Sequence, residues 1–451
     1  MKPRFVIWLG FLLGSCAFGQ SLSPSSPLSG PRAETAAFHM PTATPEQEAE
    51  LNLDQLIQEL FHSNPDLGAA KKRLEAFQAR PPQEGSLPDP RITMGWISNG
   101  YPYPGAGLGV EPTANVGFQL SQGFPYPGKR TLKTTIARKE AESTAMDLQT
   151  MERYLVKQLK IAYYELGYVY ESIDLLKRNR EVLQRLARAA DNRYSLGRGT
   201  QQDLIKAQLE LTLIDKKLLL EQRKKGSFKA EINTLLNRAP DEALGRPPRK
   251  LAGPTLGSMQ ELQRLAEESS PRLKSQRALI DEKQFRVQLA RREYYPDFDV
   301  MGGYYNMGVL KDMWEFKVQM NIPIFYWRKQ RLGLEESAYR LAEAQRSYRA
   351  SELELSYRVR DQFLAAQTAQ SLLEIYQQRL LPQSQLALES SLTSYETGAV
   401  DFLTVLSNFG AILENEKDYY EQRTEYLKAM ANLEEAVAMN LSSDKPQEAK
   451  P

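Results

Sequence analysis

An unbroken helical pattern of unusual length constrains this chain more than any other feature. Residues 129–195 carry it with no helix breaker stronger than Gly167. Such a helix extends on the order of 100 Å, a length that no compact globular domain accommodates. A turn at residues 196–199 leads into a second expected helix, residues 200–237. Its apolar residues lie three and four positions apart, as in a coiled coil: Leu204, Ala207, Leu211, Ile214 and Leu218.

The chain contains the same order of segments twice, roughly 200 residues apart, which indicates a duplication. Residues 51–238 form the first unit and residues 258–441 the second, and a Pro-rich linker joins them at 239–257. The pair Asn64-Pro65 of the first unit recurs as Ser270-Pro271 in the second.

The second unit is expected to contain long helices at residues 326–395 and 401–440, which match the two long helices of the first. In the first unit, a short amphipathic helix stops at Asn64-Pro65. A second short helix is expected to end at Pro81-Pro82, because proline disrupts a helix interior.

Four short segments alternate between apolar and polar residues, which is the pattern of β-strands. In one of them Phe316 and Val318 point to one face, whereas Glu315 and Lys317 point to the other. The pattern fits a half-buried sheet of a soluble domain, and equally a membrane strand with lipid on one side and water on the other. The four expected strands are residues 91–98, 115–121, 297–305 and 315–322, each about long enough to cross hydrocarbon when tilted.

In a membrane, these strands would turn their polar side chains away from lipid. Asp297, Asp299, Glu315 and Lys317 are therefore candidates for the lumen of a barrel, where charge tunes permeation. Four strands are too few to close a barrel, and unpaired strand edges are not tolerated in lipid. We therefore expect the strands to be shared between subunits, with eight strands from two chains or twelve from three.

The N-terminus has the layout of a secretory signal peptide, expected over residues 1–19. Leu13-Gly14-Ser15-Cys16 resembles a lipobox, which would make residues 1–15 a lipoprotein signal and Cys16 the lipidated first residue. The alternative is ordinary cleavage after Gly19, which discards Cys16. Residues 20–50 are expected to form a flexible arm and residues 442–451 a disordered tail.

Composition excludes several classes of function. The chain has 58 basic and 56 acidic residues and a net charge of +2, so no bulk field favours nucleic acid. Cys16 is the only cysteine, and His39 and His62 are the only histidines, so no metal site is expected. No nucleophile–base pair, phosphate-binding loop or carboxylate pair is recognisable, so neither an enzyme nor a cofactor is expected.

The order of these segments resembles the outer-membrane efflux protein family, the channel-tunnels of tripartite pumps and type I secretion. The resemblance covers essentially the whole mature chain. It rests on the Asn64-Pro65 and Ser270-Pro271 pairs, on Leu87-Pro88-Asp89-Pro90, on the Gly128-Lys129-Arg130 helix entry and on two Tyr-x-x-Gly turns. It implies a mixed α and β fold, mostly α, in which a homotrimer forms a twelve-stranded outer-membrane β-barrel and a periplasmic α-helical tunnel.

The resemblance also implies a passive export duct from the periplasm to the outside. A periplasmic adaptor, or membrane fusion protein, and an inner-membrane pump open such a duct, while the barrel contacts outer-membrane lipid. The lipobox and the Gly128-Lys129-Arg130 helix entry resemble those of family members that serve pumps of the resistance-nodulation-division type. The cargo, whether drugs, heavy-metal ions or polypeptides, is not encoded in any recognisable residue.

By the same resemblance, the two Tyr-x-x-Gly turns lie at the periplasmic tip, where the channel closes and meets the adaptor. Tyr194, Gly197 and Asp203 belong to the first turn, and Tyr395, Gly398 and Asp401 to the second. The family's paired gate aspartates correspond to Thr404 and Ser407, so a strongly acidic gate is not carried over. The alternative for both glycines is a plain helix C-cap.

A competing hypothesis is a periplasmic coiled-coil scaffold or adaptor that holds partners without conducting anything. It accounts for the long helices. It leaves four two-faced strands in symmetric positions unexplained.

Overall fold

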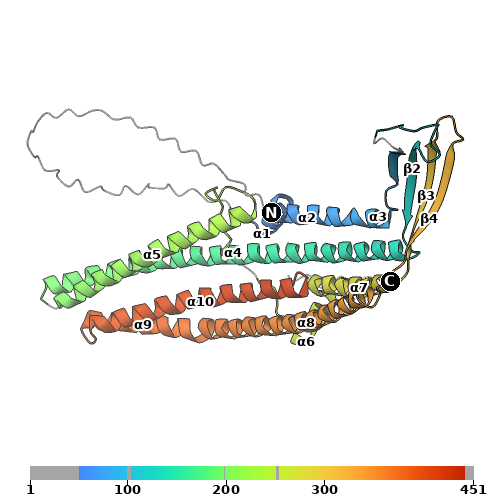
Figure 1. The fold of residues 1–451 in the computed structure, drawn as a ribbon. Coiled ribbons are helices and arrows are strands. Elements are labelled where there is room, and N and C mark those ends of the chain that lie inside the picture. Colours follow the sequence, from blue (N-terminus) through green and yellow to red (C-terminus); the bar gives the residue numbers. More distant parts are fainter. Residues whose placement is uncertain (1–49, 99–102, 198, 250–252, 442–451) are drawn as a thin grey trace, which may run out of the picture. The chain divides into compact units, whose positions relative to one another are not determined.

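A computed structural model of the protein describes residues 50–98, 103–197, 199–249 and 253–441. Helices account for most of these residues, and four strands form one antiparallel sheet (Figure 1). Both observations confirm the mixed, mostly helical fold class. The signal peptide with Cys16, the arm up to residue 49 and the tail after residue 441 lie outside the described residues.

Three short helices open the first unit: α1 (Leu53–Ser63), α2 (Pro65–Gln78) and α3 (Arg80–Gly85). Asn64 separates α1 from α2, and its side-chain oxygen accepts a hydrogen bond from the Leu67 N–H at 3.0 Å. The expected helix end at Pro81-Pro82 is wrong. Both prolines lie in the first turn of α3, where a missing N–H breaks no helical hydrogen bond.

The long helix α4 (Lys129–Ser195) is unbroken over 67 residues. After the turn, α5 (Gln201–Leu235) returns along it, and α4 also packs against α7 and α10 (Figure 1). Because α7 and α10 belong to the second unit, α4 carries most of the helix packing between the two units.

The second unit repeats this order with α6 (Met259–Ser269), α7 (Pro271–Arg292), α8 (Gln330–Ile375), α9 (Leu381–Thr397) and α10 (Phe402–Val437). The single helix expected over residues 326–395 is interrupted by a π-helical turn, η1 (Tyr376–Leu380). Pro382 supplies the physical reason. It lacks the N–H for an i−4 bond and its ring crowds that carbonyl, and a wider turn just before it relieves both problems.

The start of α8 also differs from the expected position. Residues 324–329 form turns, in which the Arg328 N–H donates to the Phe325 carbonyl at 3.1 Å. Phe325 and Tyr326 each pack edge-on against Trp327, with ring centroids 5.8 and 5.3 Å apart. Helical geometry therefore begins only at Gln330.

The strands are β1 (Arg91–Ile97), β2 (Asn115–Phe124), β3 (Asp297–Asn306) and β4 (Met313–Asn321), in the order β1-β2-β3-β4. Each unit contributes one hairpin. The antiparallel pairing of β2 with β3 joins the hairpins, with Val116 opposite Asn306 and Phe124 opposite Phe298. The duplicated units therefore share one sheet.

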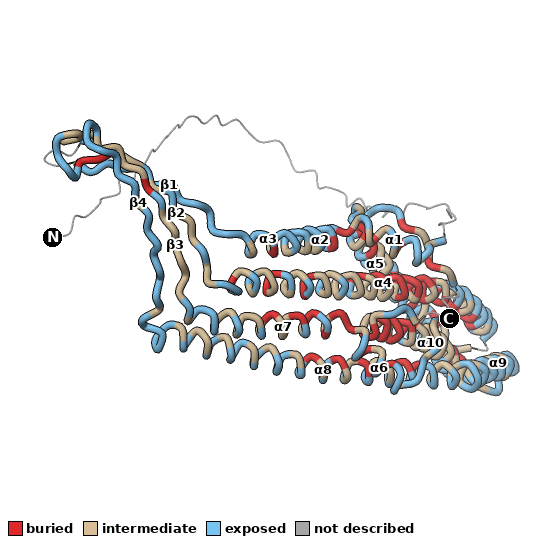
Figure 2. The backbone as a smooth tube through the Cα atoms, turned by 90° about the vertical axis from the view of Figure 1, so that its right-hand side faces the viewer, coloured by how far each residue is buried: buried red, intermediate tan, exposed pale blue. Residues whose placement is uncertain are grey.

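Buried apolar residues gather between the helices rather than in the sheet (Figure 2). One cluster packs α1 against α4 and α5, around Leu60 and Leu159. A second lies between α4, α5, α9 and α10, around Ile214 and Phe402. A third joins α6, α8 and α10 around Leu433. Within the part of the chain that the structure describes, no helix is both long and apolar enough to cross a membrane.

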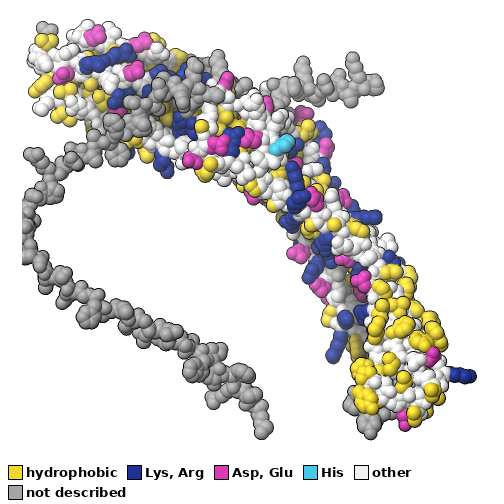
Figure 3. All heavy atoms as spheres, turned by 90° about the horizontal axis from the view of Figure 1, so that it is seen from above, with side chains coloured by type: hydrophobic (Ala, Val, Ile, Leu, Met, Phe, Trp, Pro, Cys, Tyr) yellow, Lys and Arg dark blue, Asp and Glu magenta, His cyan; other side chains and the backbone are white. Residues whose placement is uncertain are grey.

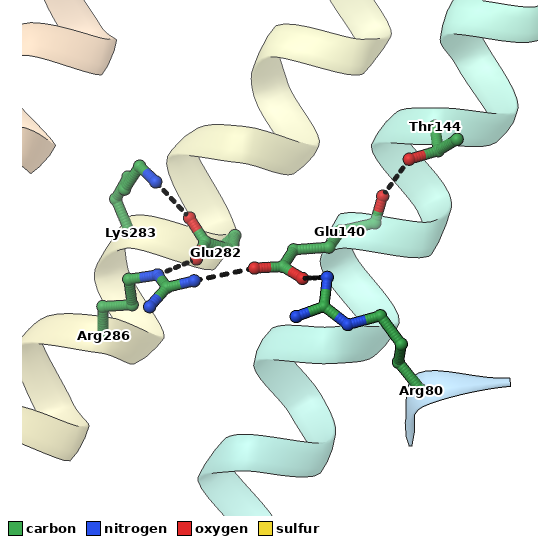
Figure 4. Close-up of polar contacts among 6 residues, drawn as sticks. All are labelled: Arg80, Glu140, Thr144, Glu282, Lys283 and Arg286. Carbon is green, nitrogen blue, oxygen red and sulfur yellow. Dashed lines mark hydrogen bonds and ion pairs between the residues drawn. The ribbon is translucent and has the colours of Figure 1, made fainter. Parts of the chain in front are cut away.

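Charged side chains link α3, α4 and α7 across the two units (Figure 4). Glu140 of α4 accepts from Arg80 and from Arg286, each at 2.7 Å. Arg286 also pairs with Glu282 of the same helix, and Lys283 lies 2.9 Å from that carboxylate. Glu282 is only 1% exposed, so these two cations compensate a charge that water does not reach.

Candidate functional site

The register of the sheet sorts its side chains onto two chemically different faces. Thr93 lies opposite Gln119, and Met301 lies opposite both Ser121 and Lys317. Because directly opposed residues share a face, the polar residues of all four strands lie together. This polar face includes Arg91, Thr93, Gln119, Ser121, Asp297, Asp299, Glu315, Lys317 and Gln319.

Two of the predicted lumen residues contact each other on this polar face. Lys317 forms an ion pair with Glu315, which also accepts a hydrogen bond from the Tyr305 hydroxyl at 3.0 Å. Asp299 lies opposite Gln319 near the other end of the strands. The face therefore carries charge of both signs rather than one.

The opposite face of the sheet is apolar and exposed. Met94, Trp314 and Phe316 are 79%, 78% and 76% exposed. In Figure 3, hydrophobic side chains gather at the end of the chain that carries the strands. Among the described residues, the strands make their extensive contacts only with one another, so no helix covers this face. An uncovered apolar surface of this kind marks a contact with lipid or with another protein.

The sheet has two free edges within one chain. β1 pairs only with β2, and β4 pairs only with β3, among the residues that the structure describes. The outer N–H and C=O groups of these two strands therefore have no partner strand in the same chain. Such edges are templates for pairing with further strands.

Asp297 lies at the base of the sheet, where the strands meet the helices. One of its carboxylate oxygens lies 2.9 Å from Lys129 Nζ and accepts from the Tyr126 N–H at 2.7 Å. Lys129 is 3% exposed, and it also lies 3.4 Å from Glu293 and donates to the Tyr295 carbonyl. This predicted lumen residue is therefore also a structural anchor between β3 and the start of α4.

At the other end of the helices, two turns connect α4 to α5 and α9 to α10. We refer to the described residues 193–197 and 199–203, and to residues 395–404, as the two hairpin tips. Gly197 and Gly398 adopt left-handed conformations with φ of +70° and +81°. The Gly197 N–H donates to the Tyr194 carbonyl at 2.9 Å, and the Gly398 N–H donates to the Tyr395 carbonyl at 3.0 Å. Both glycines therefore end a helix in a conformation that side chains disfavour.

Arg193 joins the two hairpin tips. Its guanidinium donates to the Tyr395 carbonyl and lies over the Tyr395 ring, 4.4 Å from the centroid. Tyr395 is 5% exposed and packs against Phe402 with centroids 5.6 Å apart, whereas its counterpart Tyr194 is 44% exposed. The duplicated tyrosines therefore have different environments, and burial raises the pKa of the Tyr395 hydroxyl.

The predicted aspartates of the tips act as helix caps. Asp203 and Thr200 form a reciprocal capping box at the start of α5. Asp401 caps α10 and accepts from both the hydroxyl and the N–H of Thr404, at 2.5 and 3.0 Å. These hydrogen bonds lower the pKa of the Asp401 carboxyl. Thr404 and Ser407 are both exposed on α10.

The described residues contain no group of three or more acidic, histidine or cysteine side chains that would hold a metal ion. Two contacts of the site are not recognisable in the sequence, that of Arg193 with Tyr395 and that of Asp297 with Lys129. The two residues of each pair are 202 and 168 positions apart in the sequence. The only sequence signal for either contact is a positive charge at each end of α4, Lys129 at its start and Arg193 in its last turn.

Comparison with known proteins decides the family. The family model described as "Outer membrane efflux protein" matches residues 56–238 and 262–438, in step with the two units. The chain belongs to this family. The role of this efflux protein is thus that of an outer-membrane efflux channel, which excludes the scaffold hypothesis.

Individual relatives agree with this assignment. The efflux protein is 22% identical to the cobalt-zinc-cadmium resistance protein CzcC of Cupriavidus metallidurans over 411 residues, 90% of this chain and 93% of CzcC. Its fold matches the outer-membrane channel OprN with a TM-score of 0.74 at 18% identity, over 86% of this chain and 90% of that one. VceC of Vibrio cholerae matches with a TM-score of 0.74 at 19% identity, over 86% and 97%.

Proposed function

We propose that the efflux protein works as a homotrimer in which three sheets close one twelve-stranded β-barrel in the outer membrane. The free edges of β1 and β4 support this, because hydrocarbon does not tolerate unpaired strand edges. The exposed apolar face supports it most strongly: facing lipid, it needs no further cover. The polar face, with Asp297, Asp299, Glu315 and Lys317, then lines the lumen.

In this proposal the helices form a tunnel that extends into the periplasm. The duct is passive and catalyses no reaction of its own. A periplasmic adaptor and an inner-membrane pump of the resistance-nodulation-division type open it and supply the cargo. The name of the relative CzcC directs the first transport tests to cobalt, zinc and cadmium ions. We also propose, from the lipobox-like sequence, that Cys16 is lipidated.

The hairpin tips are the proposed gate and adaptor contact. Arg193 of the first tip holds Tyr395 of the second through both its carbonyl and its ring. Opening by separation of the tips requires this contact to break. Gly197 and Gly398 set the sharp turns, and Asp203 and Asp401 with Thr404 fix the helix starts, while Ser407 lies on the exposed surface of α10 beyond Thr404.

Single-channel conductance in planar bilayers tests both parts of the proposal. We expect a small conductance from the unmodified protein and a several-fold larger one from Arg193→Ala, because the contact that holds the tips together is lost. Tyr395→Phe is the matched control: the described residues offer its hydroxyl no hydrogen-bond partner, so its removal should change nothing. Absence of conductance from every variant contradicts the channel. Equal conductance of Arg193→Ala and the unmodified protein contradicts only the proposal that the Arg193–Tyr395 contact holds the tips together.

A further inference from the structure

A basic pocket lies where the two units meet, away from both the sheet and the hairpin tips. Residues of α2, α4, α7, α8 and α10 line a volume of about 520 Å³. That size is typical of small-molecule sites. Five cationic side chains line it, Arg73, Arg153, Lys157, Arg272 and Arg358, against two carboxylates, Asp147 and Glu435.

The two carboxylates neutralise only part of the charge of these five cations. Asp147 accepts a hydrogen bond from the Ser275 hydroxyl at 2.6 Å. Glu435 lies 3.3 Å from Arg358 and 3.9 Å from Lys157, so one carboxylate faces two cations. Crowding like charges in a partly buried pocket is unfavourable unless an anion compensates them.

Several of the arginines that line the pocket have hydrogen-bond donors without a partner among the described residues. The Nε atom of Arg358 is buried and has no hydrogen-bond partner among the described residues. Arg153 forms no ion pair within the described part of the chain, nor does exposed Arg73, which lies 5.8 Å from the Phe77 ring centroid. Arg272 is the exception, since Glu354 binds it at 2.9 and 3.3 Å.

The N-terminus of α7 adds to the positive potential. Ser270, Pro271 and Arg272 line the pocket, and α7 is 22 residues long, so the positive end of its dipole lies at this wall. Ala436 also lines the pocket and lies next to the last residue of α10, Val437, so the negative end of that helix dipole offsets part of this potential. Among the described residues, no carboxylate forms an ion pair with the guanidinium groups of Arg73 and Arg153.

We propose that this pocket binds a phosphate group, held by Arg73, Arg153, Lys157 and Arg358. Guanidinium forks recognise phosphate oxygens through paired hydrogen bonds, and a doubly charged tetrahedral anion accepts them from several directions at once. Leu148, Met151 and the Tyr154 ring form an apolar part of the same lining, which suits a phosphate carried on an apolar body. A soluble phosphate and a phospholipid headgroup share this chemistry.

Titration calorimetry on the full-length protein in non-ionic detergent tests the proposal, with inorganic pyrophosphate and short-chain dihexanoyl phosphatidic acid as separate probes. We expect one saturable site per chain for at least one probe, with affinity that falls as salt is added. Tighter binding of pyrophosphate identifies a soluble phosphate as the occupant, and tighter binding of phosphatidic acid identifies a lipid headgroup.

Three variants make the test specific. Arg153→Gln should weaken binding about tenfold, as expected for the loss of one charge-assisted donor. Arg346→Gln, an exposed arginine of α8 outside the pocket, should bind like the unmodified protein. Arg73→Gln, also exposed, replaces Arg153→Gln if that variant misfolds. Absence of saturable binding by both probes, or undiminished binding by the pocket variants, overturns the proposal, and neither result depends on channel activity.

Discussion

Individual side chains connect parts of this chain that are far apart in the sequence. Lys129 opens α4, yet its charge is compensated by Asp297, 168 residues later. The Lys129 side chain is 3% exposed and the Asp297 side chain is 43% exposed. The buried lysine therefore needs the ion pair more than the half-exposed aspartate does. Removal of the exposed partner leaves a buried charge, whereas removal of the buried partner leaves a carboxylate that water can solvate.

We therefore expect Asp297→Ala to lower the free energy of unfolding by about 1–3 kcal/mol, a range reduced because Glu293 remains 3.4 Å from Lys129. Lys129→Met, which keeps the shape of the side chain without its charge, should cost less. Urea unfolding of the detergent-extracted protein, followed by tryptophan fluorescence, measures both. If Lys129→Met lowered the free energy of unfolding more than Asp297→Ala does, the conclusion that Lys129 depends more on the ion pair would be wrong.

Asp401 gives a pH-dependent prediction at the second hairpin tip. Hydrogen bonds from Thr404 lower the pKa of this carboxyl below its ordinary value of 3.8, so the folded state favours the ionised form. Its stabilising effect is complete above the ordinary value and is lost only as the pH falls through the lowered pKa of the folded state. The start of α10 should therefore be equally stable at pH 8 and at pH 5.

Hydrogen exchange at the Thr404 amide checks this prediction. Asp401→Ala should exchange several-fold faster at both pH values because the cap is lost, while Asp401→Asn should remain protected because asparagine also caps helices. If Asn fails to protect the amide, the charge and not the hydrogen bond stabilises the tip.

Secondary-structure elements were largely predictable from local patterns. Alternation identified all four strands because successive strand side chains face opposite sides, and the observed register sorts polar and apolar residues as that alternation requires. The helix pattern failed at Pro382, because periodicity alone does not reveal how a helix accommodates a proline. The Arg193–Tyr395 contact was not predictable, since local periodicity carries no information about neighbours 202 residues apart.

The two faces of β4 provide a matched pair of substitutions. If the apolar face contacts lipid, Val318→Arg should cost roughly 2–4 kcal/mol near the middle of the membrane. Gln319→Arg introduces the same side chain one residue later, on the polar face, and should assemble normally. The measurement is the fraction of each variant recovered as heat-resistant oligomer from the outer-membrane fraction. Equal recovery of the two variants would contradict the assignment of faces.

At the scale of the whole molecule, duplication gives each chain two hairpins and two pairs of long helices, but a sheet with two free edges. The two units are not equivalent: only the second contains a π-helical turn among the described residues, and only its tip tyrosine is buried under an arginine. A single chain is therefore incomplete where the strands end, and the proposed trimer completes it.

The central claim, that three copies close one barrel, is tested most directly by electron microscopy of particles extracted from the outer-membrane fraction, with no symmetry imposed. We expect threefold tubes on the order of 100 Å or longer, as the length of α4 requires, with one compact end formed by the strands. Single slender rods without that end, or absence of the protein from the fraction, would contradict the claim.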